Sequence, residues 1–190
     1  MNLIVNVDLD WGIGRDGRLL VRLSEDMKRF RQLTTGQTIV LGRKTLETFP
    51  NTRPLPDRTN IVLTRDQHFK AECAQICHNL AELAICLADI PTESVFITGG
   101  DSLYHQLLPF CHKAYVTRVH RHFLADTFFP NLDRNPAWKM IEAGPVQTGI
   151  SRLGDPNDAL SFQFCLYRQD QPTDLLQWVR ERGELFDEES

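Results

Sequence analysis

Short apolar segments that run into glycine recur along the chain, and they constrain the fold more than any other feature. Leu3–Val7, Thr38–Leu41 and Val95–Thr98 are aliphatic and β-branched, and the last two lead directly into Gly42 and Gly99. Continuous apolar runs of this length are typical of strands buried on both faces of a sheet. Helix-compatible stretches separate them. The pattern therefore predicts strand–helix alternation around a mainly parallel sheet.

The pattern changes after a further expected strand at Ala114–Val119. Candidate strands at Trp138–Ala143 and Ser161–Tyr167 follow one another with no helix between them, and Gln147–Ala159 is predicted to be a loop. Consecutive strands without a crossover pair in antiparallel fashion. We therefore expect an α/β fold with a mostly parallel central sheet, an antiparallel C-terminal edge and helices on both faces.

An amphipathic helix is predicted after Ser24, which is expected to be its N-cap. Met27, Phe30 and Leu33 form the apolar stripe at helical spacing. The other expected elements are a strand at Asn60–Thr64, a short helix from about Arg43, and helices at Leu80–Leu87 and Asp101–Leu108.

Composition excludes several classes of protein. The 190 residues are 42% hydrophobic and 24% charged, which is typical of one soluble domain with or without a short appendage. The chain has no apolar stretch of about 20 residues and no basic segment before its first apolar run, so neither a membrane protein nor a secreted one is expected. The expected location is cytoplasmic.

Acidic residues are concentrated in the C-terminal segment. Residues 170–190 carry a net charge of −5, which leaves +1 for the rest of a chain whose formal charge is −4. Because the rest of the chain is nearly neutral, we expect no extended basic face of the kind that binds nucleic acid, although a local basic pocket is compatible with this charge. We interpret residues 1–168 as one domain and 169–190 as an acidic, partly helical extension. Its apolar residues, expected to dock on the domain, are Leu175, Leu176, Trp178 and Val179.

The cysteines predict neither disulfides nor a metal site. The spacing Cys73-x3-Cys77-His78 lacks the second ligand pair that a zinc site would need. Reduced, mostly buried thiols are expected. The five cysteines are Cys73, Cys77, Cys86, Cys111 and Cys165.

Two strand–glycine–helix junctions are candidate phosphate sites. Gly99-Gly100 lies between a predicted strand and helix, where helix N-termini bind anions, although an ordinary tight turn explains it equally well. At the second junction, Arg43 and Lys44 follow Gly42. Bases at a helix start are unfavourable unless an anion offsets them. With Arg65 just past another strand, these junctions suggest a phosphate-bearing cofactor, although G-x-G-x-x-G is absent.

Asp26 has two interpretations that the pattern leaves open. It is at the start of a predicted helix, where a carboxylate interacts favourably with the helix dipole. If it instead faced an apolar cleft, desolvation would raise its pKa and make it a group that handles protons or pairs with a cation.

Six segments, taken together and in order, resemble the dihydrofolate reductase family. The similarity extends over about Asn2 to Arg168, and a single segment would be a weak signal, whereas six with suitable gaps are a strong one. The segments are Trp11–Gly14, Leu23–Phe30, Leu41–Glu47, Arg53–Asn60, Ile97–Gly100 and Asp126–Pro130.

The resemblance implies reduction of 7,8-dihydrofolate to tetrahydrofolate by hydride from NADPH. Asp26 matches the family's acid in the pterin pocket, which favours protonation at N5 before hydride reaches C6, and Thr117 matches the hydroxyl that bonds it. Arg58 matches the arginine that pairs with the substrate's glutamate α-carboxylate. The positions that match the pocket walls are Phe30 and Leu55, with Ile4, Val5, Met27 and Phe49 nearby.

The resemblance also implies a set of cofactor-binding residues. Arg43, Thr64 and Arg65 match the side chains around the adenosine 2′-phosphate, which indicates NADPH over NADH. Ile13 and Gly14 match the start of a mobile loop over the nicotinamide. The remaining cofactor positions are Asn6, Gly42, Lys44, Thr45, Leu63, Thr98, Gly99, Gly100, Ser102, Leu103 and Tyr104. The implied partners are dihydrofolate and NADPH, with no nucleic acid, membrane or metal, and a monomer is expected.

The sequence departs from the family pattern at several positions. Leu20-Val21 replaces a frequent Pro-Trp, Ser24 replaces a frequent proline, and Asn6 and Thr98 replace residues that are usually small or aliphatic. Two alternative functions follow. The related pyrimidine reductase of riboflavin synthesis has a substrate without glutamate, which leaves Arg58 unexplained. A non-catalytic protein that binds folate or NADPH has only Leu20-Val21 in its favour.

Overall fold

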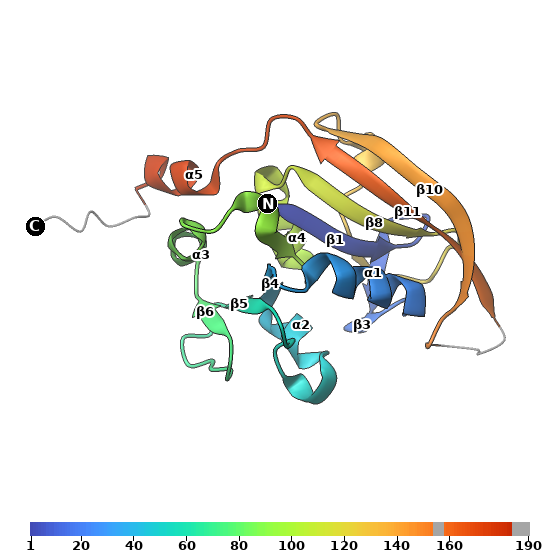
Figure 1. Ribbon diagram of the computed structural model, residues 1–190, viewed down its shortest axis with the longest axis horizontal. Coiled ribbons are helices and arrows are strands. Elements are labelled where there is room, and N and C mark those ends of the chain that lie inside the picture. Colours follow the sequence, from blue (N-terminus) through green and yellow to red (C-terminus); the bar gives the residue numbers. More distant parts are fainter. Residues whose placement is uncertain (154–157, 184–190) are drawn as a thin grey trace, which may run out of the picture.

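An eight-stranded sheet forms the centre of the molecule (Figure 1). The computed structural model describes residues 1–153 and 158–183. The strand order is β10-β11-β8-β1-β7-β4-β5-β6. All neighbours from β8 to β6 pair in parallel, and β11 is antiparallel to both β8 and β10. The strands are β1 (Asn2–Val7), β4 (Thr38–Gly42), β5 (Thr59–Leu63), β6 (Gln75–Cys77), β7 (Val95–Ile97), β8 (Lys113–Val119), β10 (Trp138–Ile150) and β11 (Ala159–Gln169).

Alternate residues of β1 supply both layers of the core. Leu3, Val5 and Val7 are buried with residues of three helices on one face, whereas Ile4 packs with residues of two helices on the other. The predicted class, a mostly parallel sheet with an antiparallel edge and helices on both faces, is confirmed. The first face carries α3 (Leu80–Leu87), α4 (Asp101–Leu107) and α5 (Leu175–Glu181), and the second carries α1 (Ser24–Thr34) and α2 (Arg43–Glu47). None of the helices in the described part of the chain is long and apolar enough to cross a membrane.

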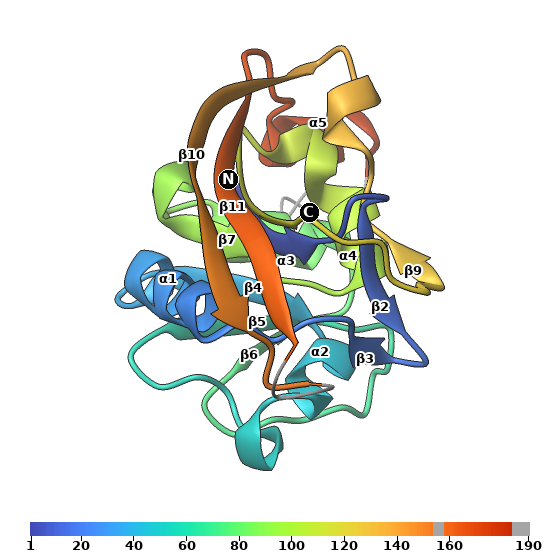
Figure 2. The same cartoon turned by 90° about the vertical axis from the view of Figure 1, so that its right-hand side faces the viewer.

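A small second sheet lies beside the carboxyl end of β1 (Figure 2). Its order is β3-β2-β9, and it consists of β2 (Gly12–Arg15), β3 (Arg18–Leu19) and β9 (Thr127–Phe128). None of these three strands is expected from the sequence, because strands this short show no periodic pattern.

Two local predictions are wrong. Ser24 is the first helical residue and not the N-cap, which is Leu23 without a side-chain bond. The Ser24 hydroxyl instead accepts a hydrogen bond from Arg152 Nε at 3.1 Å. The predicted loop from Gln147 begins too early, because β10 continues to Ile150. Register shifts before Val146 accommodate the Gly144-Pro145 pair, and the missing N–H of a proline is tolerated on an edge strand.

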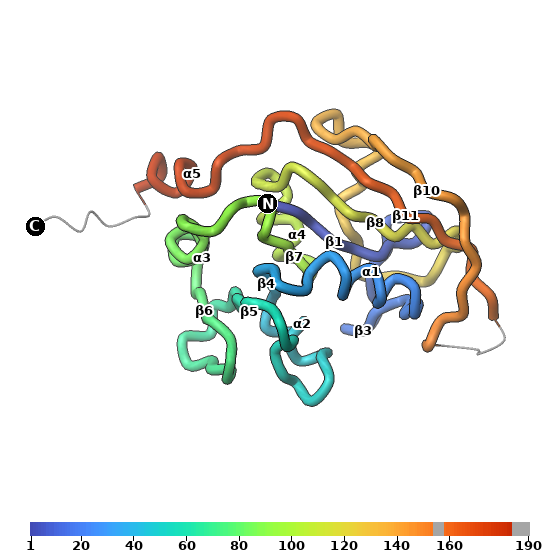
Figure 3. Tube along the Cα trace, viewed as in Figure 1, coloured from blue at the N-terminus to red at the C-terminus, as the bar shows by residue number. Residues whose placement is uncertain are grey.

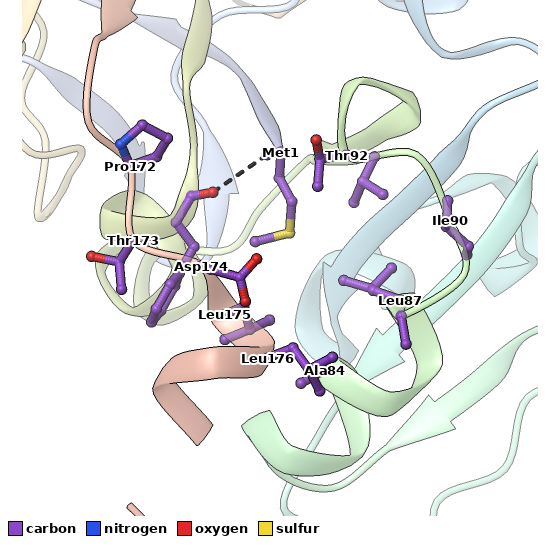
Figure 4. Close-up of a pocket in the computed structure, with 13 residues that line it drawn as sticks. Met1, Ala84, Leu87, Ile90, Thr92, Pro172, Thr173, Asp174, Leu175 and Leu176 are labelled. Atoms are coloured by element: carbon purple, nitrogen blue, oxygen red, sulfur yellow. Dashed lines mark hydrogen bonds between the residues drawn. The ribbon is translucent and has the colours of Figure 1, made fainter. Parts of the chain in front are cut away.

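The C-terminal extension docks on the domain, as predicted. Figure 3 traces the chain from β11 back across the molecule to α5, which packs against α3. Leu175 and Val179 are buried, and the Trp178 ring meets Phe110 edge-on with centroids 5.4 Å apart. Leu175 and Leu176 face α3 across an apolar cavity of about 280 Å³ (Figure 4).

Removing part of this contact is expected to reduce stability and leave the distant cleft intact. Val179 is 0% exposed, so Val179→Ala is expected to lower the free energy of unfolding by about 1–3 kcal/mol. The exposed neighbour Arg180→Ala is the matched control and should change it by less than about 0.5 kcal/mol. Denaturant unfolding measures both, and equal effects would show that α5 is not part of the core.

Candidate active site

A mainly apolar cavity of about 460 Å³ opens beside the carboxyl end of β1. It lies between the loop that precedes α1, α1 itself and the segment that follows α2. Fourteen of the site residues proposed from the sequence line it: Ile4, Val5, Asn6, Ile13, Asp26, Met27, Phe30, Thr45, Phe49, Leu55, Thr98, Gly99, Gly100 and Tyr104.

Asp26 projects from the first turn of α1 onto the central strands. The Thr117 hydroxyl donates to Asp26 Oδ1 at 2.6 Å, and the Asn6 amide donates to Oδ2 at 3.4 Å. Asn6 and Thr117 are directly opposite each other on β1 and β8, so the sheet register places both donors together. Of the two interpretations of Asp26, the one that faces it into a cleft therefore describes its position.

The environment of Asp26 favours a bound proton. Burial raises the pKa of the Asp26 carboxyl above its usual value. The hydrogen bonds from Thr117 and Asn6, and the positive charge of Arg29 one turn along α1, act in the opposite direction and are outweighed. Among the described residues, no cluster of three or more metal-ligating side chains is present. What this cleft offers is an acid that holds and releases a proton.

Apolar side chains and one arginine continue the cleft away from Asp26. Phe30 packs with the inner cluster, together with Phe49 and Leu55. The Arg58 guanidinium lies outside the cavity lining, with its Cζ 5.9 Å from the Phe30 ring centre. Its Nε donates to Thr34 Oγ1 at 2.8 Å and its Nη1 donates to the carbonyl oxygen of Pro56 at 2.6 Å. These bonds hold a cation at the outer end of an apolar slot.

The two glycine junctions, far apart in sequence, contact each other. Gly42 N donates to the carbonyl oxygen of Gly99 at 2.8 Å. A Cβ atom on Gly100 would lie 3.2 Å from Thr45 Oγ1, and Gly99 has φ +123°, a conformation that favours glycine. The junctions therefore form one cradle in which backbone N–H groups are open to close approach.

The basic residues proposed for the phosphate lie beside this cradle. Gly42 pairs with Leu63 at the carboxyl ends of β4 and β5, so Arg43 and Thr64 follow adjacent strands. Arg43 Nη1 is 2.6 Å from Glu47 Oε1, a partly exposed pair. The proposed residues that do not line the cavity are Gly14, Gly42, Arg43, Lys44, Arg58, Leu63, Thr64, Arg65, Ser102, Leu103 and Thr117.

The three proposed residues on α4 have different surroundings. Leu103 is buried in the core, and its contact with the cradle is a backbone one, from its N–H to the carbonyl oxygen of Gly100 at 3.0 Å. Ser102 is exposed on α4. Tyr104 is buried, and its hydroxyl donates to the carbonyl oxygen of Ile4 at 2.7 Å, which ties α4 to the centre of β1.

Asp8 lines the cleft and was not proposed from the sequence. It is 2% exposed, its Oδ1 accepts from Gly12 N at 2.7 Å and Asp10 N at 2.9 Å, and its Oδ2 accepts from Phe123 N at 2.9 Å. It therefore anchors the loops at the mouth of the cavity. Its place directly after a buried strand was the available signal, since a polar group there must find partners.

Leu20 and Val21, at the position of the family's frequent Pro-Trp, also line the cleft. Val21 is buried in a cluster with Leu23 and Val119, against which Leu20 packs. This pair therefore anchors the loop before α1 to the core.

A glycine cradle beside a half-buried carboxyl, at the end of a mostly parallel α/β sheet, is typical of a small-molecule enzyme that binds a nucleotide cofactor. The dihydrofolate reductase family model matches residues 1–168. The chain belongs to the dihydrofolate reductase family.

Individual relatives are similar over nearly their whole length. The chain is 37% identical over 170 residues to the dihydrofolate reductase of Staphylococcus haemolyticus, covering 89% of this chain and 95% of that one. It is 32% identical over 171 residues to the Bacillus subtilis (strain 168) enzyme, covering 89% and 94%. A solved structure of the Enterococcus faecalis enzyme complexed with NADP(H) and RAB-propyl aligns with TM-score 0.73 and 32% identity, over 90% of this chain and 96% of that one.

Proposed function

We propose that this protein reduces 7,8-dihydrofolate to 5,6,7,8-tetrahydrofolate with NADPH, with protonation at N5 and hydride transfer to C6. The observation that carries the proposal is the half-buried Asp26 carboxyl, held by Thr117 in an apolar cleft that the glycine cradle also lines. The family membership and the relatives named dihydrofolate reductase support the same reaction.

Asp26 is the residue that binds the pterin and controls its proton. Its ionised oxygens accept from the pterin amino group and ring nitrogen, and its raised pKa extends the pH range over which the carboxyl holds a proton. The Thr117 hydroxyl fixes the orientation of the carboxyl group. Apolar walls around it exclude water, so the proton stays associated with the bound ring.

The rest of the substrate extends along the apolar slot. Phe30 and Leu55 form the walls for the aminobenzoyl ring, with Met27 and Phe49 beside them. Arg58, already oriented by Thr34 and Pro56, pairs with the glutamate α-carboxylate. A pyrimidine reductase would leave this oriented cation without a partner.

The cofactor residues fit a dinucleotide at the glycine cradle. Gly99 and Gly100 leave open space where side chains would meet Thr45, which suits the close approach of a pyrophosphate to the backbone. Arg43, Thr64 and Arg65 surround the 2′-phosphate at the ends of β4 and β5. NADPH, when bound, supplies the hydride.

The unusual Asn6 and Thr98 are accommodated by hydrogen bonds. Asn6 donates to Asp26, so this chain places a second donor on the acid, which lowers the pKa of Asp26 relative to burial alone. The Thr98 hydroxyl donates to the carbonyl oxygen of Val40 at 3.4 Å. Asn6 therefore adjusts the pKa of Asp26, and the hydroxyl of Thr98 has a hydrogen-bond acceptor on the neighbouring strand.

The proposal includes a monomer in the cytoplasm. All five cysteines are free thiols, which is typical of a reducing compartment. The near-neutral body supports the absence of nucleic-acid partners.

Removal of the Asp26 acid tests the reaction. In the native enzyme, activity that depends on protonated Asp26 is lost as pH rises through its raised pKa. Asp26→Asn is expected to lower dihydrofolate reduction about 10²–10⁴-fold near neutral pH, to abolish this pH step, and to leave NADPH affinity nearly intact. The control is the exposed Lys28→Gln on the same helix. A collapse of NADPH affinity with an unchanged residual rate would contradict the role of Asp26.

Arg58→Gln separates folate reduction from other reductase activities. It is expected to raise KM for dihydrofolate about 10–100-fold through loss of a charge-assisted hydrogen-bond pair, with kcat and KM for NADPH little changed. A dihydropterin without glutamate should react equally with both enzymes, and it serves as the control substrate. A uniform loss on both substrates would remove Arg58 from glutamate recognition.

Arg43→Ala tests the choice of cofactor. Loss of a 2′-phosphate partner is expected to weaken NADPH binding about 10-fold or more while NADH binding changes little. The measurement is KM for each cofactor from the decrease in reduced-nicotinamide absorbance. Equal losses for the two cofactors would exclude this role, and tight binding of both ligands without turnover in the native protein would favour the non-catalytic alternative.

A further inference from the structure

Two thiols face each other at the β6 edge of the main sheet. Cys77 is the last residue of β6 and Cys86 lies in α3, and their sulfur atoms are 3.4 Å apart. Cys77 is 1% exposed, whereas Cys86 is only half-buried. Figure 1 shows β6 and α3 as neighbours at this end of the molecule. A disulfide needs a separation of about 2.05 Å, so a small approach of the two elements joins them.

The connection between these thiols is well ordered by hydrogen bonds. Asn79 caps α3 by accepting from Glu82 N at 2.8 Å, and His78 N donates to Glu82 Oε2 at 2.8 Å. β6 has three residues and is the edge strand of the main sheet, so among the described strands only β5 is hydrogen-bonded to it. The thiols are thus joined by a hydrogen-bonded helix start and the α3 helix itself, which ends one residue after Cys86.

Cys77 is also bonded to the segment proposed to hold the 2′-phosphate. It pairs with Leu63 in the sheet register, and its carbonyl oxygen accepts from Thr64 N at 2.9 Å. His78 Nδ1 lies 3.1 Å from the carbonyl oxygen of Thr64. Both backbone groups of Thr64 therefore have partners in the two residues that would move if Cys77 were drawn toward α3.

We propose that Cys77 and Cys86 form a reversible disulfide that weakens NADPH binding by displacing Thr64 and Arg65. The modification site follows from the geometry of the thiols, and its effect on the cofactor depends on the proposed function. The site lies outside the catalytic cleft, since neither cysteine lines that cavity.

The oxidant is a low-molecular-weight disulfide. The thiolate of Cys86, the accessible member, attacks one sulfur of that disulfide, breaks its S–S bond and expels one small thiolate, which leaves a mixed disulfide. Cys77 then loses its proton to solvent, attacks the Cys86 sulfur and expels the second small thiolate. The two protein thiols lose two electrons and two protons, and the small disulfide takes up the two electrons.

The second step is expected to be slow at neutral pH. Burial, followed by the hydrogen bond with Cys86, raises the pKa of Cys77 to about 12. A thiolate is the attacking species, so closure of the disulfide accelerates as pH rises. A dithiol reductant reverses it by the same exchange.

The experiment compares the purified full-length chain incubated with oxidised glutathione or with dithiothreitol. Peptide mapping by mass spectrometry is expected to find a Cys77–Cys86 cross-linked peptide only after oxidation. KM for NADPH should rise about three- to tenfold, the loss of roughly one well-placed hydrogen bond, with KM for dihydrofolate unchanged. Dithiothreitol should restore the original value.

Three variants complete the test. Cys86→Ser should abolish both the cross-link and the shift in KM, and Cys77→Ser should do the same in whatever fraction folds. Cys73→Ser, which removes an exposed thiol nearby, should leave both intact. Accumulation of glutathionylated Cys86 without the cross-link overturns the disulfide, and a cross-link with unchanged KM for NADPH overturns its effect on the cofactor.

Failure of the proposed function gives a different result. If the reduced chain does not oxidise NADPH with dihydrofolate, the reductase assignment fails, whereas the peptide map still decides whether the two cysteines join. Direct titration of NADPH binding to the oxidised and reduced chain then replaces KM, so the effect on the cofactor is decided without turnover.

Discussion

The hydrogen bond from Thr117 to Asp26 is the interaction on which the site depends. It joins α1 to β8 in the interior, where the loss of a partner would leave a polar group buried and unsatisfied. Asn6 adds a bond from the adjoining strand, so the position of Asp26 is set by the register of the central sheet. A shift of one residue between β1 and β8 would separate the two donors, so that they could no longer bind the same carboxyl group. The parallel pairing of β1 with β8 therefore determines where the Asp26 carboxyl is held.

The glycine cradle depends on the same sheet. Gly42 ends β4 and Gly99 follows β7, and because these strands are neighbours, the hydrogen bond between the two glycines closes the carboxyl edge next to β1. The acid and the cradle meet because β1 and β7 are also adjacent. Tyr104 joins them, since it lies in the helix after Gly100 and bonds to Ile4. The strand order therefore brings the proposed cofactor cradle and the proposed proton donor to the same end of the sheet.

Sequence patterns predicted the parts of the fold that have strong local signals. The buried strands around Val5, Val40 and Ile97 were recognisable as apolar runs, and α3 was predicted at its observed bounds. The strand order was not predictable from local pattern, because it depends on pairings between distant segments. The second sheet was missed because its strands have two to four residues, and the extent of β10 was missed because Gly144-Pro145 normally ends a strand.

The candidate site was predictable to a similar degree. Glycines between strands and helices indicated the cradle, but no pattern showed that Gly42 and Gly99 would touch. The position of Asp26 at a helix start fitted two interpretations, and only the family resemblance chose between them. Asp8 was missed because its role is to bind backbone groups of two loops, and its place after a buried strand indicates a need for partners without showing which groups they are. Contacts such as these join segments that are distant in the sequence, so local sequence patterns do not reveal them.

The buried acid also links proton binding to folding. In the unfolded chain the Asp26 carboxyl has its ordinary pKa, whereas in the folded protein the pKa is raised. Between these two values the folded state holds a proton that the unfolded state has released, so the stability contributed by this residue falls as pH rises. Above the raised pKa, where Asp26 is ionised in the folded protein too, its charge therefore opposes folding. The residue proposed to carry the chemistry therefore lowers the free energy of unfolding when it is ionised, and the packing of the rest of the core must compensate for this loss.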